Sequence, residues 1–116
     1  MTEHDFDSQI QDLISIGQWD IAYHVFEQRQ YARRSEKGFP DYFLVRVQDD
    51  LASFTINWDN KVEQNNIRIV ALEVKGTGGK LTDEQVICLE FLRLTGKVEV
   101  YALWPEDSDL AVEILK

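Results

Sequence analysis

Apolar residues recur at helical spacing near the start of the chain. Between Glu3 and Ile16 they stand at positions 6, 10, 13, 14 and 16, with polar residues between them, close to a period of 3.6 residues. Thr2 precedes this stretch as a candidate N-cap, and Gly17 follows it as a stop signal. The pattern therefore predicts an amphipathic helix over residues 3–16.

Several later stretches are short, apolar and rich in β-branched or aromatic residues, which is typical of β-strands. They cover residues 19–26, 41–47, 51–58, 67–75 and 98–104. The polar segments 27–37 and 59–66 between them are predicted to be loops. Residues 67–72 are almost free of polar side chains, so we expect segment 67–75 to be a central strand.

Two further helices flank the last predicted strand. Thr82 is a capping residue, and Gln85 three positions later completes a capping-box pattern, so a helix is predicted over residues 82–95. A short amphipathic helix is predicted over 107–115. The resulting order, α-β-β-β-β-α-β-α, predicts an α/β fold with a mixed β-sheet flanked by helices. The strand at 67–75, the helix at 82–95 and the strand at 98–104 form a βαβ unit, in which the two strands should be parallel and the crossover right-handed.

Composition limits the class of protein. The chain has 116 residues, of which 44% are hydrophobic, as expected for a single globular domain over 1–116. Neither an apolar run of membrane-spanning length nor a leader pattern is present, which predicts a cytoplasmic protein and no membrane partner. Cys88 is the single cysteine and lies among apolar residues, so we expect a buried thiol without catalytic function.

The charge is strongly acidic overall but uneven along the chain. A formal net charge of −9 argues against nucleic acid as a partner. Residues 29–37, however, carry four basic side chains and one glutamate, a local charge of +3, directly before the strand at 41–47. Basic side chains in such a loop are suited to phosphate contacts. The candidate DNA-binding residues are Arg33, Arg34, Lys37 and, after the later glycine turn, Lys80.

The end of the strand at 67–75 carries the candidate chemistry. Glu73 and Lys75 lie two residues apart, so they share one face of the strand, about 7 Å apart along it. If the strand at 41–47 pairs beside it, Asp41 joins them. Two carboxylates are the hard oxygen ligands that Mg²⁺ or Mn²⁺ prefers, and a neighbouring lysine can stabilise charge on a phosphate. The sequence therefore predicts a metal-dependent site at this sheet end.

The order Pro-Asp followed by Glu-x-Lys is the active-site pattern of the PD-(D/E)XK nuclease superfamily. The wider context resembles its virus-type replication-repair nuclease (VRR-NUC) family, in particular the small stand-alone phage-type members. The residues that carry this resemblance are Gln9-Ile10, Gly17–Trp19, Tyr23-His24, Gly38–Arg46, Glu73–Gln85, Leu89–Gly96, Val98–Tyr101 and Trp104–Asp107. They cover nearly the whole chain.

The resemblance implies a restriction-endonuclease-like core and hydrolysis of phosphodiester bonds in DNA with Mg²⁺ or Mn²⁺. Asp41, Glu73 and the Val74 carbonyl would be metal ligands. Lys75 would be the catalytic lysine, and Gln85 the helix glutamine near the metal and the scissile phosphate.

The resemblance also implies a residue from the first helix, a substrate and an assembly. Gln9 and Glu3 are both candidates for the first-helix residue, and the sequence does not decide between them. The expected substrate is branched or structured DNA, such as a four-way junction or flap, and the expected assembly is a homodimer. Two chains would double the small surface that 116 residues offer to a duplex.

Two features depart from the family pattern. Segment 48–66 is longer than in compact members, and the charge of −9 is unusual for an enzyme that acts on DNA. They leave a second hypothesis, a non-catalytic interaction protein on the same fold whose acidic surface binds a basic partner or mimics nucleic acid. The charge of the surface around Asp41, Glu73 and Lys75 separates the two hypotheses.

Overall fold

A computed structural model of the chain describes residues 1–25, 38–47 and 67–116. These residues form three α-helices, a short 3-10 helix and a four-stranded sheet. The strand predicted at 51–58 and the loops predicted at 27–37 and 59–66 lie outside the described residues. None of the described helices is long and apolar enough to cross a membrane.

The elements follow the predicted order closely. In chain order they are α1 (Glu3–Ile16), β1 (Ile21–His24), β2 (Tyr42–Val47), β3 (Ile67–Val74), α2 (Asp83–Leu94), β4 (Glu99–Leu103), the 3-10 helix η5 (Pro105–Asp107) and α3 (Ser108–Leu115).

Strand β1 is shorter than predicted, and its first expected residues explain the difference. Gln18 has a positive φ of 56°, which turns the chain sharply after α1. The Asp20 N–H then donates to the Val45 carbonyl at 3.0 Å, so bonding to β2 begins just before the strand itself. The predicted start at residue 19 was therefore two residues early, and β1 starts at Ile21.

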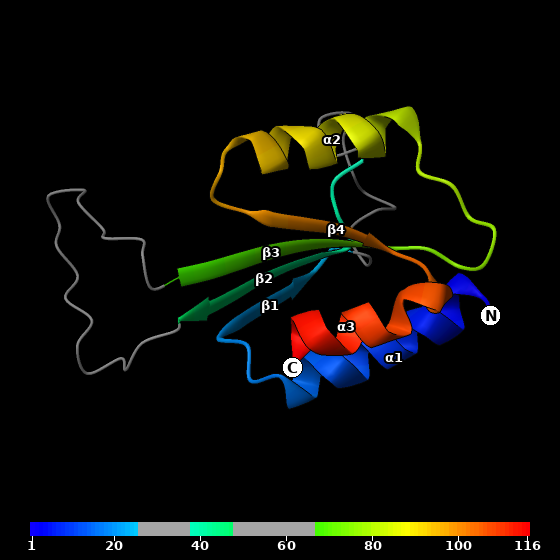
Figure 1. Cartoon of the computed structure of the whole chain (residues 1–116), viewed down its shortest axis with the longest axis horizontal. Helices are drawn as coiled ribbons and strands as arrows, with labels where there is room; N and C mark the ends of the chain where they lie inside the picture. Colours follow the sequence, from blue (N-terminus) through cyan, green and yellow to red (C-terminus); the bar gives the residue numbers. More distant parts are fainter. Residues whose placement is uncertain (26–37, 48–66) are drawn as a thin grey trace, which may run out of the picture.

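The sheet is mixed, with the order β1-β2-β3-β4. Strands β1 and β2 are antiparallel, as are β2 and β3, whereas β3 and β4 are parallel. Helix α2 connects the parallel pair, which confirms the predicted parallel βαβ unit. Figure 1 shows α2 over one face of the sheet and both α1 and α3 over the other. The fold therefore has three layers: α2, the sheet, and the α1–α3 pair. Side chains on one face of β3 point toward α2, and those on the other face point toward α1 and α3.

The main core lies between the sheet and the α1–α3 pair. Three alternate residues of β3, Val70, Leu72 and Val74, are buried in it against residues such as Phe6 and Ile10 of α1. Because successive strand side chains point to opposite faces, the residue between Leu72 and Val74 must point toward α2. That residue is Glu73, so the alternation of β3 places a carboxylate under a helix.

Candidate functional site

Asp41 and Glu73 meet where β2 begins and β3 ends. In the antiparallel register Tyr42 pairs with Leu72, and one further step brings Asp41 opposite Glu73. Residues directly opposite in such a pair lie on the same face of the sheet. The Asp41 carboxylate also accepts the Val74 N–H at 2.8 Å. The pairing of the two predicted strands is confirmed, and it places both candidate carboxylates at one sheet end.

Glu73 is fully buried, and two side chains reach the same oxygen of its carboxylate. The Gln85 amide donates to Glu73 Oε1 at 2.8 Å, and the Lys75 ammonium lies 3.7 Å from that atom. Asp41 and Gln85 are also buried, with exposed fractions of 6% and 8%, and the Lys75 side chain is 12% exposed. A carboxylate at such depth is stable only with donors and a cation nearby, and both are present.

The N-terminus of α2 brings Gln85 over the sheet. Thr82 and Gln85 form the predicted capping box, in which Gln85 N–H donates to the Thr82 hydroxyl and Thr82 N–H donates to the Gln85 side chain. Gly38 fixes the position of this turn. A Cβ atom on Gly38 would lie 2.4 Å from the carbonyl group of Glu84, and Gly38 has a φ of +83°. Only glycine fits here, three residues before Asp41.

The glycine turn after β3 contacts the start of α1. A Cβ atom on Gly76 would lie 2.5 Å from the Glu3 nitrogen. The Thr77 N–H donates to the Met1 carbonyl at 3.0 Å. This contact places the backbone of Glu3 close to the chain that follows Lys75, while its side chain is exposed. Of the two candidates on the first helix, Glu3 is therefore the one near the sheet end.

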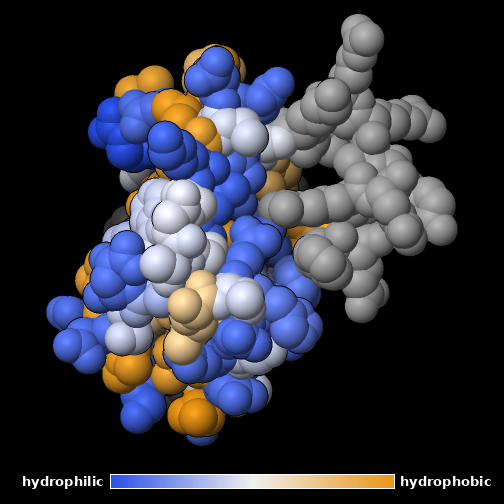
Figure 2. All heavy atoms as spheres, turned by 90° about the vertical axis from the view of Figure 1, so that its right-hand side faces the viewer, coloured by the Kyte–Doolittle hydropathy of each residue, from blue (hydrophilic) through white to orange (hydrophobic). Residues whose placement is uncertain are grey.

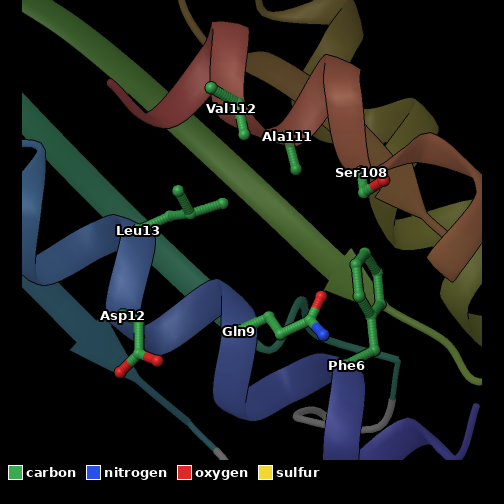
Figure 3. A pocket seen from close by; sticks show the side chains of 7 residues that line it. All are labelled: Phe6, Gln9, Asp12, Leu13, Ser108, Ala111 and Val112. Carbon is green, nitrogen blue, oxygen red and sulfur yellow. The ribbon is translucent and has the colours of Figure 1, made fainter.

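Gln9 points elsewhere. It lines a groove of about 270 Å³ between α1 and α3, together with residues such as Phe6 and Ala111 (Figure 3). That groove is on the face of the sheet opposite α2 (Figure 1). The structure therefore does not bring Gln9 to Glu73, and the side chain that reaches Glu73 from a helix is Gln85 of α2.

The predicted basic residues are only partly visible in the structure. Arg33, Arg34 and Lys37 lie outside the described residues, and Lys80 is exposed beyond the glycine turn. The first turns of the two nearby helices are acidic, with Glu3 and Asp5 in α1 and Asp83 and Glu84 in α2. Carboxylates at helix N-termini are stabilised by the helix dipole, so their positions have a structural cause as well.

Sequence reasoning missed the proximity of Cys88 to this site. Burial raises the pKa of the Cys88 thiol, and the charge of Glu73 raises that pKa further. The thiol is thus held in its neutral form, as expected for a cysteine without catalytic function. It is half-buried and not fully buried as predicted. Its spacing of three residues from Gln85 puts both on the inner side of α2, which the helical period could have indicated.

The donor set suits a small divalent cation. Asp41 and Glu73 offer carboxylate oxygens, the ligands that Mg²⁺ prefers, and Mg²⁺ usually keeps several waters when one or two carboxylates bind it. Within residues 1–25, 38–47 and 67–116, no group of three or more His, Cys, Asp and Glu side chains gathers to form a complete protein-only metal site. The fit is therefore to a two-carboxylate centre completed by waters, a backbone carbonyl or substrate oxygens.

Comparison with known proteins gives no further identification. No family model matches the chain, and no curated protein or solved structure is significantly similar to it. Any assignment therefore depends on the residues at this sheet end.

Proposed function

We propose that this protein is a metal-dependent DNA endonuclease with a restriction-endonuclease-like core, related to the VRR-NUC family. One observation carries the proposal: Asp41, Glu73, Lys75 and Gln85 meet at one end of the β2–β3 pair, where the two carboxylates share a face. Two buried acids and a lysine at a sheet end suit phosphodiester hydrolysis, because the carboxylates can bind a divalent cation and the lysine can stabilise charge on a phosphate.

In this proposal Asp41 and Glu73 hold Mg²⁺ or Mn²⁺, with the Val74 carbonyl as a third ligand. Such an ion supplies Lewis-acid stabilisation of the phosphate charge and lowers the pKa of a water molecule. The Val74 N–H donates to Asp41 Oδ2 at 2.8 Å, which fixes the orientation of that carboxylate. Gln85 fixes Glu73 in the same way from the opposite side.

Lys75 has the catalytic role in the proposal. Its ammonium lies 3.7 Å from Glu73 Oε1, at the point where the strand leaves the sheet. A cation at this distance from a metal ligand can approach a phosphate oxygen or orient the attacking water. Because charge on the phosphate oxygens grows in the transition state, the ammonium stabilises that state more than the bound substrate.

The proposed substrate is branched or structured DNA of replication, recombination or repair, processed in the cytoplasm. Lys80 would contact phosphates, as would Arg33, Arg34 and Lys37. We also propose that the protein acts as a homodimer. The outer face of α2 supports this, because several apolar side chains are exposed there, among them Ile87 at 52%, Phe91 at 68% and Leu94 at 69%. Figure 2 shows apolar atoms at its top, on the side of the molecule where α2 lies.

The experiment is cleavage of labelled linear, flapped and four-way DNA in Mg²⁺, Mn²⁺ and EDTA. The proposal expects cutting of at least one structured substrate in Mg²⁺ or Mn²⁺ and none in EDTA. Glu73→Gln should abolish cutting, whereas Glu113→Gln, on the exposed side of α3, should not change it. Cutting by the Glu73→Gln protein at the wild-type rate would rule the proposed site out.

A second candidate function is an acidic interaction protein on the same fold. It is favoured by the exposed carboxylates of Glu3, Asp5, Asp83 and Glu84 on the first turns beside the site. This function predicts that the protein binds a basic peptide and that it does not cleave DNA with metal. Salt should weaken the binding, and so should the double substitution Asp83→Asn and Glu84→Gln. The nuclease proposal predicts that the same double substitution preserves cleavage or increases it, since it lowers repulsion of DNA.

A further inference from the structure

The orientation of the Gln85 amide is determined by Thr82. The backbone N–H of Thr82 can only donate, so the atom of Gln85 that faces it at 2.8 Å must be the oxygen Oε1. The other end of the amide, the Nε2 group, is then directed to Glu73 Oε1, also at 2.8 Å. The helix cap thus decides which end of Gln85 meets the carboxylate.

Rotation of this amide by 180° is unfavourable at both ends. It would place the Gln85 NH₂ group against the Thr82 N–H, two donors, and the Gln85 oxygen against the Glu73 carboxylate, two acceptors. Thr82 is exposed, but Gln85 is 8% exposed and Glu73 is fully buried, so little water is present to compensate at the Glu73 end. The orientation that presents a donor to Glu73 is therefore strongly preferred while the cap is formed.

The cap of α1 has similar chemistry, but its backbone packs against Gly76 of the glycine turn, whereas the cap of α2 includes Gln85 itself. Thr2 is its N-cap, and the Thr2 hydroxyl accepts the Asp5 N–H at 3.1 Å. Asp5, however, is exposed. The two threonines thus form matched caps, of which the one in α2 is continuous with the candidate site.

We infer that Thr82 is a positioning residue for Glu73, acting through the Gln85 amide. Its hydroxyl accepts the Gln85 N–H and holds the first turn of α2 in the geometry that directs the Thr82 N–H to Gln85 Oε1. Gln85 then keeps a donor on the Glu73 carboxylate, which stabilises its negative charge and fixes its direction. The consequence for cation binding rests on the proposed function, whereas the amide orientation does not.

The test compares Thr82→Ala, Thr82→Ser and the control Thr2→Ala. Nuclear magnetic resonance reports solvent exchange of the Gln85 side-chain NH₂ protons, and calorimetry reports the affinity for Mn²⁺. Thr82→Ala should speed exchange at least about tenfold and weaken Mn²⁺ binding by about tenfold, the loss typical when a residue that orients a metal ligand is removed. Thr82→Ser should restore both values. Thr2→Ala should leave the exchange of the Gln85 amide unchanged, although it also removes a cap; because the start of α1 packs against Gly76, this exchange and not the Mn²⁺ affinity is its control measurement.

Equal exchange of the Gln85 amide in Thr82→Ala and Thr2→Ala would overturn the inference, because a cap that only stabilises its helix predicts this result. If the wild-type protein binds no Mn²⁺, the proposed metal centre fails, and the exchange of the Gln85 amide still decides whether Thr82 orients it.

Gln85→Glu tests the donor separately, since glutamate keeps the capping box but presents an oxygen to Glu73. It should lower the melting temperature in EDTA, and an unchanged melting temperature would contradict the requirement for a donor.

Discussion

The two ends of strand β3 carry two different charge clusters. Arg68 lies near its beginning, and Glu73 lies near its end, five residues later. Both side chains form an ion pair, with Glu99 and with Lys75 respectively. The two clusters differ in what surrounds each pair.

The Arg68 cluster has a clear structural role. The Nε and Nη2 groups of Arg68 both donate to the Glu99 carboxylate. The remaining nitrogen, Nη1, donates to the Ile114 carbonyl at 3.0 Å. Arg46 donates to the Leu115 carbonyl at 3.3 Å and lies over the Trp19 ring at 4.1 Å. These bonds satisfy carbonyls in the last turn of α3, which helix geometry leaves without partners. Stability alone explains this cluster.

The Glu73 cluster is more deeply buried than the Arg68 cluster. Asp41 and Glu73 are both buried, and the Lys75 ammonium lies beside Glu73, whereas the Glu99 side chain is 40% exposed. The distance of 3.7 Å between Lys75 and Glu73 is longer than in a direct charge-assisted bond, whereas Arg68 and Glu99 are in close bidentate contact. Two buried carboxylates on one face of the sheet, with an ammonium that is not in direct contact, favour binding of a divalent cation. The difference separates a cluster that stabilises the fold from one that is suited to chemistry.

The largest expected effect is that of Lys75→Ala on cleavage. Loss of one preorganised charge-stabilising group typically lowers the rate by about 10² or more, and we expect a loss of this size in single-turnover cleavage. The melting temperature in EDTA should fall, because the buried Glu73 carboxylate loses its ion pair and keeps only its bond to Gln85, so cleavage is compared at a temperature where both proteins are folded. If the Lys75→Ala protein cuts at the wild-type rate, Lys75 has no catalytic role and only stabilises the fold, as Arg68 does.

Arg68→Ala should give the opposite result. It removes the Glu99 pair and the bond to Ile114, so we expect urea unfolding to show a loss of about 2 kcal/mol. Cleavage by the fraction that remains folded should not change. The control is Arg93→Ala, since Arg93 forms an exposed pair with Glu90 and its loss should have no measurable effect. Equal stability of the two variants would refute the structural role of Arg68.

A smaller effect is expected from pH. The hydrogen bond from Arg68 holds the pKa of Glu99 below its ordinary value of 4.5. A carboxyl with a lowered folded-state pKa contributes stability that is complete above 4.5 and is lost as the pH falls through the lower, folded-state value. Glu99→Gln should therefore flatten the acid side of the stability profile. An unchanged slope below pH 4.5 would mean that other carboxyls control acid unfolding.

Local signals in the sequence were sufficient to predict the helices. The period of apolar residues and the caps at Thr2 and Thr82 gave α1 and α2 within about one residue at each end. The site was predictable in part for the same reason. Asp41 and Glu73 stand at strand ends, and Gln85 occupies the third position of a capping box, so each has a position fixed by its own segment.

Contacts between distant segments could not be predicted from such signals. Gln9 and Glu3 are both on α1, and which face of α1 meets α3 depends on packing in the folded core. The contact of Gly38 with the Glu84 carbonyl joins residues far apart in the chain, and the glycine in the sequence suggests only a turn. The hydrogen bond from the Trp19 indole to the Leu115 carbonyl likewise joins residues at opposite ends of the chain.

Titration of Mn²⁺ by calorimetry tests most directly whether the two ends of β3 differ in function. Three proteins should be compared: wild type, Asp41→Asn and Glu99→Gln. Asparagine can still accept the Val74 N–H, so the fold at Asp41 is preserved while the charge is removed. We expect one Mn²⁺ site in the wild type, affinity at least about tenfold weaker in Asp41→Asn, and wild-type affinity in Glu99→Gln. Equal Mn²⁺ affinity in the wild type and Asp41→Asn would contradict the assignment of this sheet end as a metal site.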